Sequence, residues 1–202
     1  MKKQLSIILL LFCTTIMVAQ KGKVQEGDWK NLKNITTFNL EFDYSDLEIP
    51  KYDNEEEFLK DKMQKREDKN PGSGEEFKKS WFADREDRYE PKFIESFNKR
   101  WKENEVVVGK DLADAEYTIK IHTTFMYAGY NVGVVRQNSK IDAILTVYKN
   151  DAPDTVLFEI KYTKAEGNGA FGNDYNSGYR ISEAYAKLAK TFAANLKKKA
   201  KK

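Results

Sequence analysis

The stretch of this chain best suited to ligand chemistry is its glycine-rich segment, Glu166–Gly178. It contains Gly167-Asn-Gly-Ala-Phe-Gly172, which matches the pattern G-x-G-x-x-G, between a predicted strand and a predicted helix. Glycine allows backbone N–H groups to approach a ligand closely or to form an anion-binding nest. The candidate ligand-binding residues in and beside this segment are Asn168, Asp174, Tyr175 and Arg180.

The same pattern does not extend to a dinucleotide-binding fold. Such a fold needs another parallel strand after the helix and an acidic residue at the end of that strand, whereas this sequence ends with the helix. We therefore expect no nucleotide and no other cofactor. The composition favours a plain strand-to-helix connection, in which Asn176 or Ser177 caps the helix, over a ligand site, but both interpretations stay open.

Residues for catalysis or metal binding are scarce. His122 is the only histidine, so a multi-histidine metal site and a histidine dyad are excluded, and no nucleophile-elbow pattern surrounds it. Acidic residues occur mainly in solvated runs, without an evident catalytic pair or a calcium-binding loop. We expect no catalytic residue, no metal site and no enzymatic activity. The enzymatic alternative is a small hydrolase of an envelope polymer that uses Glu166 or Asp174.

The first twenty residues have the pattern of a secretory signal peptide. Lys2 and Lys3 precede the apolar run Leu5–Ala19, which is shorter than the about 20 residues that a membrane-spanning helix needs. We expect cleavage after Ala19 or Gln20, a periplasmic or secreted protein, and no transmembrane segment after cleavage. Cys13 follows the bulky Phe12, so lipid anchoring at this cysteine is not expected. Loss of Cys13 with the signal would exclude disulfides and thiolate sites.

The basic charge lies at the two ends of the sequence. Of the 35 Lys and Arg residues, two lie in the signal and five in the last six residues, which leaves 28 against 32 Asp and Glu. A domain that binds nucleic acid carries clustered basic residues on one face, so we expect no nucleic-acid partner. The terminal lysines are expected to close the last helix, and a weak contact with an anionic surface is the alternative.

Four segments alternate apolar and polar residues, as strands of a sheet covered on one side do. They are Ile35–Tyr44, Ala115–Tyr127, Lys140–Lys149 and Thr155–Thr163, the last two joined by a hairpin loop at Asn150–Asp154. In the third of these, the buried side should consist of Ile141, Ala143, Leu145 and Val147. In the second it should consist of Ala115, Tyr117, Ile119, Ile121, Phe125 and Tyr127. A short strand is also expected at Glu105–Val108.

Three helical regions complete the expected fold. They are Glu55–Lys69, Glu75–Glu103 with a division at Pro91, and Tyr179–Lys198. An apolar stripe in the second region, best explained as core rather than as an aromatic platform, consists of Tyr89, Phe93, Ile94, Phe97 and Trp101. The fold class is α+β, with two layers: a mostly antiparallel sheet of about four to five strands and helices packed on one face.

The expected domain organisation is a single domain. After the signal (1–20) come a mobile leader (21–33) with Trp29 docked, one α+β domain (34–198) with a charged helical insertion near 54–87, and a basic tail (199–202).

Two motifs give the sequence a family resemblance. Asp111-Leu-Ala-Asp-Ala-Glu-Tyr-Thr-Ile119 leads into a strand after a helix, and Ser177-Gly-Tyr-Arg-Ile181 with Ala184-Tyr-Ala-Lys187 opens the last helix. In this order the chain resembles bacterial envelope proteins related to the amino-terminal domain of the Tol-system translocation protein and to transport-auxiliary lipoproteins. The resemblance implies an envelope accessory or binding domain and carries no catalytic motif. The chain departs from that group in lacking a lipobox and in its charged insertion.

Three functions follow as hypotheses. The first is an exported, non-enzymatic accessory domain that binds or scaffolds an envelope protein or glycan. The second is the small hydrolase described above. The third is a secreted inhibitor or ligand carrier with an aromatic pocket between sheet and helices.

Overall fold

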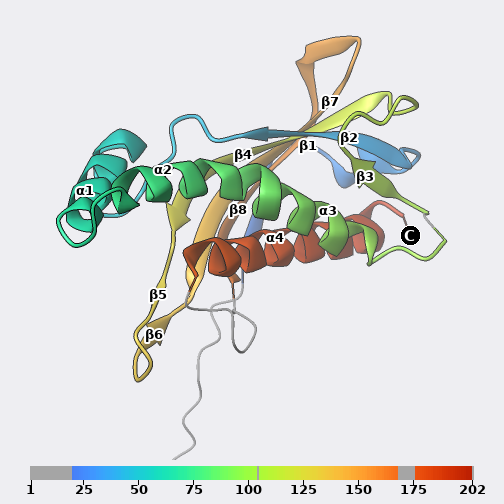
Figure 1. Cartoon of the computed structure of the whole chain (residues 1–202). Helices are drawn as coiled ribbons and strands as arrows, with labels where there is room; N and C mark the ends of the chain where they lie inside the picture. The colour runs from blue at the N-terminus through green and yellow to red at the C-terminus, as the bar shows by residue number, and fades with distance from the viewer. Residues whose placement is uncertain (1–19, 104, 168–175, 202) are drawn as a thin grey trace, which may run out of the picture.

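The computed structural model describes residues 20–103, 105–167 and 176–201, and in this part the chain forms two layers (Figure 1). One layer is a six-stranded sheet with the order β1-β8-β7-β4-β2-β3, and helices cover one of its faces. The strands are β1 (Lys21–Gly27), β2 (Thr37–Asp43), β3 (Val107–Gly109), β4 (Tyr117–Tyr127), β7 (Ser139–Lys149) and β8 (Ala152–Gly167). A separate two-stranded hairpin consists of β5 (Tyr130–Asn131) and β6 (Arg136–Gln137).

The sheet is mostly antiparallel, as predicted. β1, β8, β7 and β4 pair antiparallel in succession, and β2 is parallel to both β4 and β3. The α+β class and the helices on one face are confirmed. The expected count of four to five strands is wrong, because β1 extends the sheet to six. The turn before β8 is also tighter than predicted, since β7 ends at Lys149 and β8 begins at Ala152.

The segment expected to be a mobile leader is part of the fold. β1 pairs with β8 along the edge of the sheet, with Val24 opposite Ile160. A 3₁₀ turn, η1 (Trp29–Leu32), follows, and the Asp28 carboxylate caps it by accepting a 2.8 Å hydrogen bond from the Lys30 N–H. Trp29 is docked, as expected: it is buried, and its ring centroid lies 4.6 Å from that of Phe158.

The alternation predicted for the central strand holds only for its first half. Ile119 and Ile121 of β4 are fully buried, but a β-bulge between Thr123 and Phe125 shifts the register with β7. An extra residue in one strand reverses which side chains point inward. Met126 is therefore buried in place of Phe125 and Tyr127, and the expectation for those two aromatic residues is wrong.

The helices are α1 (Glu55–Glu67), α2 (Ser73–Asp84), the π-helical turn η2 (Arg85–Tyr89), α3 (Glu90–Asn98) and α4 (Ser177–Lys199). Pro91 does not divide the second helical region, because η2 links α2 directly to α3. A proline lacks the N–H for a helical bond, and its ring clashes with the carbonyl four residues earlier. The wider π turn just before Pro91, in which the Glu90 N–H bonds to the Arg85 carbonyl, accommodates it.

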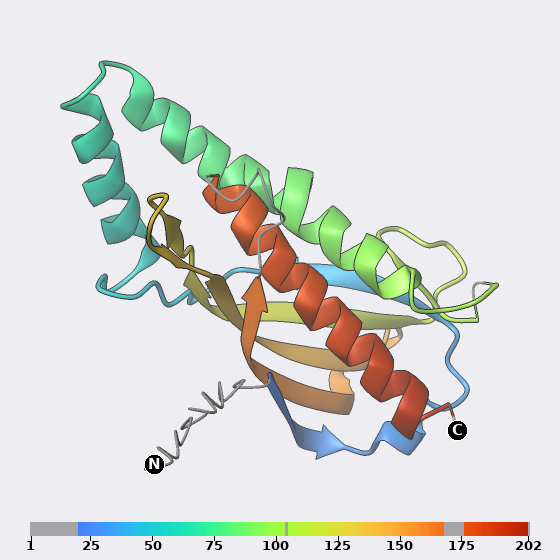
Figure 2. The ribbon, with the colours of Figure 1, turned by 90° about the horizontal axis from the view of Figure 1, so that it is seen from below.

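The core lies between the sheet and two helices that run side by side, α3 and α4 (Figure 2). Tyr89 stacks on Tyr185 at 5.3 Å between ring centroids, and Phe97 lies 6.0 Å from Phe192. The aromatic stripe expected to be core is buried, apart from the half-buried Ile94. Against it pack the inward side chains of the sheet, all at most 1% exposed: Ile119, Ile121, Ile141, Ala143, Leu145, Val147, Phe158, Ile160 and Tyr162.

Basic residues at the end of α4 contact the segment 29–35, which precedes β2. The residues 199–201, expected to form a basic tail, are therefore packed against the fold. The Lys201 ammonium donates hydrogen bonds of 2.6–2.8 Å to the carbonyls of Leu32, Lys33 and Ile35. Lys199 lies over the ring of Trp29, with 5.3 Å from its Nζ to the ring centroid. Partial burial lowers the pKa of Lys201. Lys197, Lys198 and Lys199 lie in the last turn of α4, where the helix dipole favours cations, whereas a contact of these lysines with an anionic surface stays a prediction.

Candidate functional site

Of the four sequence-predicted site residues, only Arg180 lies in the part of the chain that the structure describes, so their grouping into one site stays a prediction. Asn168, Asp174 and Tyr175 lie outside the described residues. Arg180 is described and is 7% exposed, in the first turns of α4. Its Nε and Nη2 donate hydrogen bonds of 3.0 and 3.2 Å to the carbonyls of Ala128 and Gly129. The guanidinium therefore fixes the backbone that leaves β4.

The other residues named around the glycine-rich segment also make structural contacts. Glu166 of β8 lies 3.6 Å from the ammonium of Lys140 on the neighbouring strand. Asn176 caps α4, since its side-chain oxygen accepts a 2.8 Å hydrogen bond from the Gly178 N–H. This contact agrees with the interpretation of the segment's end as a helix cap. His122 lies on the uncovered face of the sheet, with its Nε2 2.9 Å from the carbonyl oxygen of Ser45.

A polar cluster joins α2 to the first turn of α4. Asp84 is 6% exposed and forms a 3.0 Å ion pair with Arg88. Arg88 also donates a 2.9 Å hydrogen bond to Asn176 and stacks on Tyr179 at 4.4 Å. Burial raises the pKa of Asp84, against the opposing effect of Arg88. This cluster links α2 and η2 to α4. Asp84 also lines a pocket with Glu76 and Ser80, and the charge of the nearby Asp87 adds to the rise in the pKa of Asp84.

Exposed apolar side chains gather at one end of the molecule. We call this the distal end and define it by α1, α2, the β5–β6 hairpin and the first turn of α4. Both views show these elements at the same end, with α1 and the hairpin extending past the sheet (Figures 1 and 2). Among the described residues, all the large hydrophobic side chains that are clearly exposed belong to it: Phe82, Tyr130, Val132, Val134, Val135 and Tyr179.

The most exposed of these side chains form the tip of the β5–β6 hairpin. Val132, Val134 and Val135 are 67%, 96% and 52% exposed. The turn is nonetheless ordered by hydrogen bonds: the Val132 N–H donates to the Val135 carbonyl at 3.0 Å, and the Asn131 side chain accepts from the Gly133 N–H at 2.8 Å. Sequence reasoning missed this tip. The sequence did contain a signal for it: three uncharged apolar residues flank Gly133 between two short strands.

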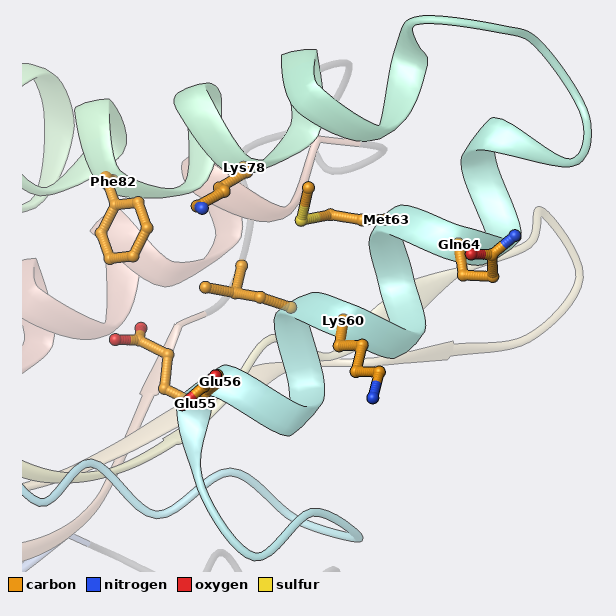
Figure 3. A pocket seen from close by; sticks show the side chains of 8 residues that line it. Glu55, Glu56, Lys60, Met63, Gln64, Lys78 and Phe82 are labelled. Carbon is orange, nitrogen blue, oxygen red and sulfur yellow. The ribbon is translucent and has the colours of Figure 1, made fainter.

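A groove runs between α1 and α2 on the same end (Figure 3). It encloses 580 Å³, and side chains from both helices converge on it. Leu59, Met63 and Phe82 supply the apolar part, with charged groups around them. Glu55 in this groove already accepts a 2.6 Å hydrogen bond from the Trp81 indole and pairs with Arg85. That pair fixes α1 against α2 and gives the groove a rigid wall.

A second cavity, of 280 Å³, lies where α1 and α2 meet the end of β4. We call it the aromatic pocket. Its lining residues are Ile49, Pro50, Lys51, Tyr52, Phe58, Lys62, Trp81, Met126, Tyr127, Ala128, Gly129 and Tyr130. The pocket predicted from the sequence was to lie between sheet and helices, and it stays a prediction, because this cavity lies beside α1 and α2 at the end of β4. The sequence did not indicate its lining residues, which come from segments far apart in the chain.

In residues 20–103, 105–167 and 176–201, no group of three or more His, Cys, Asp and Glu side chains is arranged to hold a metal ion. None of the described helices combines the length and the apolar character required to cross a membrane.

The distal end thus combines an exposed valine tip, a groove and an aromatic pocket. Neither the protein-family models nor the curated proteins that were compared with the chain give a match.

Proposed function

We propose that this protein is an exported, non-enzymatic accessory domain of the cell envelope that binds a partner protein through its distal end. The observation that carries the proposal is the gathering of the exposed large apolar side chains at that end. Apolar side chains that gather in one region of the surface indicate an interaction site, since exposing them to water is unfavourable. The chain as a whole is polar, with a mean hydropathy of −0.73. A local gathering of exposed apolar side chains therefore stands out from the rest of the composition.

Export is proposed on the basis of the expected signal peptide, and the described elements are compatible with its removal. β1 starts at Lys21, so cleavage after Ala19 would leave every described strand and helix intact. It would also keep Gln20, whose side-chain oxygen accepts a 2.7 Å hydrogen bond from the Thr191 hydroxyl of α4. The order of strand, long helical region, short strand, antiparallel strands and final helix supports the proposed relationship to the Tol-related envelope proteins.

The chemistry of the tip favours a protein partner over a glycan. Val132, Val134 and Val135 offer aliphatic surface, which packs into an apolar groove of another protein. Aliphatic side chains give no hydrogen bonds to sugar hydroxyls. The partner surface that fits this hairpin is therefore an apolar groove in an envelope protein.

A pull-down from envelope extract with the full mature chain tests this proposal. Val132→Ser/Val134→Ser/Val135→Ser removes the apolar tip without altering the charge. We expect it to lose a partner that the wild-type chain retains reproducibly.

The matched control is Lys102→Ser/Glu105→Ser, which changes two exposed residues away from the distal end and keeps the net charge. It should retain the partner. Equal recovery of the partner by the valine variant and the wild type, or no reproducible partner at all, would count against the proposal.

A further inference from the structure

The aromatic pocket has firm walls. Ile49, Phe58, Trp81 and Met126 are each at most 7% exposed, and they come from α1, α2, β4 and the segment before α1. Phe58 lies 4.7 Å from Trp81 between ring centroids. These side chains are held by the core, so the cavity exists before any ligand arrives.

The backbone wall of the pocket is also fixed. Ala128 and Gly129 line it, and their carbonyls accept the hydrogen bonds from the buried Arg180. Gly129 has φ of 63°, and a Cβ there would lie 2.3 Å from the carbonyl oxygen of Gln137. The chain can make this close turn only with glycine. The arrangement gives the pocket a defined shape at the point where β4 passes into the hairpin.

The charges in the lining have one sign. Lys51 and Lys62 belong to it, and no acidic residue does. Lys62 places its Nζ 5.4 Å from the ring centroid of Tyr52 and 5.8 Å from that of Phe58. A carboxylate outside the lining, Asp61, lies 3.5 Å from the same ammonium. Asp61 also accepts hydrogen bonds of 2.9 Å from Lys65 and 2.6 Å from the Tyr52 hydroxyl. Because Asp61 is shared with these groups, the Lys62 ammonium over the aromatic wall can meet an anionic group at the mouth.

We propose that the aromatic pocket binds a small aliphatic carboxylate, with the hydrocarbon chain among the aromatic side chains and the carboxylate beside Lys62. The cavity of 280 Å³ lies near the lower limit of small-molecule pockets, about 300 Å³, and so suits a short chain. An apolar enclosure with one or two charged groups is the usual composition of such a site. The valines of the hairpin tip are not part of this lining, and the inference stands apart from partner binding.

Isothermal titration of the full mature chain with sodium octanoate and, separately, with 1-octanol tests the inference. Both probes carry the same hydrocarbon chain, and only octanoate carries charge at pH 7. We expect saturable binding of octanoate and weaker binding of octanol. No saturable binding of octanoate, or tighter binding of octanol, would overturn it.

Two variants separate the charged contact from the cavity. Lys62→Met keeps the aliphatic stem and removes the ammonium, and should weaken octanoate about tenfold or more, as expected for loss of a charge-assisted contact, without weakening octanol. Lys60→Met, an exposed position on the same helix, is the control and should bind octanoate like the wild type.

Ala128→Leu adds bulk to the lining and should weaken the binding of both probes. Urea unfolding midpoints near the wild-type value verify that the variants fold. Equal affinity of the wild type, Lys62→Met and Ala128→Leu for octanoate would contradict the proposed site.

Discussion

Arg180 was expected from the sequence to bind a ligand, but in the structure it binds the backbone. Beside a glycine-rich segment, an arginine indicates an anion ligand. In the fold, its guanidinium binds two backbone carbonyls about fifty positions earlier in the chain, at Ala128 and Gly129. Buried carbonyls need donors, and Arg180 supplies them where β4 leaves the sheet. Its part in any binding at the distal end is therefore to position the pocket wall.

Replacing Arg180 should destabilise the protein. Arg180→Met leaves the carbonyls of Ala128 and Gly129 without these donors, and we expect the free energy of unfolding to fall by about 1–3 kcal/mol. Urea unfolding followed by circular dichroism measures the change. Lys187→Met is the control, because Lys187 is exposed on the same helix and its loss should cost at most about 0.5 kcal/mol. Similar values for the two variants would show that Arg180 has no such role.

Asp43 should make stability depend on pH. Partial burial acts to raise its pKa, but hydrogen bonds from Lys120 and Ser45 outweigh this effect and hold the pKa well below its ordinary value of 3.8. A carboxyl with a lowered folded-state pKa stabilises the fold above its unfolded pKa, and this contribution is lost as the pH falls toward the folded value. Asp43→Asn should therefore be less stable than the wild type at pH 7, and the difference should shrink below pH 3.8. Thermal unfolding at pH 7 and pH 3 is the test. A difference independent of pH would refute the assignment.

At the scale of elements, the β5–β6 hairpin depends on two glycines with different surroundings. Gly129 and Gly133 both have positive φ, 63° and 86°. A Cβ at Gly129 would meet the Gln137 carbonyl at 2.3 Å, whereas one at Gly133 would meet nothing within 4 Å. Both alanine variants carry the backbone strain of a positive φ, about 1–2 kcal/mol, but only Gly129→Ala adds a clash.

Comparison of these two alanine variants isolates the clash. Gly129→Ala should lower the free energy of unfolding more than Gly133→Ala does, and amide hydrogen exchange in residues 126–139 should rise more. The reverse order would mean that the turn at Gly129 relaxes freely and does not fix the pocket wall.

The elements that sequence reasoning found are those with one buried side and a regular period. β7 is the clearest case, because Ile141, Ala143, Leu145 and Val147 all point inward without interruption. β1 escaped notice because an edge strand needs backbone partners more than apolar side chains, and Val24 is its only large apolar residue. The bulge in β4 was invisible for a different reason: register depends on the partner strand.

The candidate site was harder to predict than the fold. The valine tip can be recognised only from the exposure of its side chains, and the aromatic pocket only from the way distant segments meet, as Phe58 and Trp81 do. Periodicity reports which residues a strand or helix buries. It does not report which apolar residues the finished fold leaves in water.

For the molecule as a whole, the exposed large apolar side chains of the described residues lie at the distal end of an α+β domain. Away from the distal end, the contacts described above stabilise the fold. α3 and α4 cover the core, and lysines at the end of α4 bind the segment around Trp29 and Leu32. Such an asymmetry leaves one end of the molecule suited to binding.

Processing of the exported chain gives a prediction at this scale. Cleavage after Ala19 keeps the contact between Gln20 and Thr191, so the mature protein should begin at Gln20. Intact-mass spectrometry of the protein recovered from the periplasm or the medium measures this directly. A product that begins at Met1, or one that begins within β1, would contradict the proposed export or the role given to β1.

Binding of an envelope protein through the distal end can be tested by photo-crosslinking in cells that produce the protein. A benzoylphenylalanine replaces Val134, and the chain is otherwise unchanged. We expect the probe at position 134 to give a discrete crosslinked product with an envelope protein. The same probe in place of Lys102, away from the distal end, should give none. The absence of a product from Val134, or the same product from both positions, would contradict binding through the distal end.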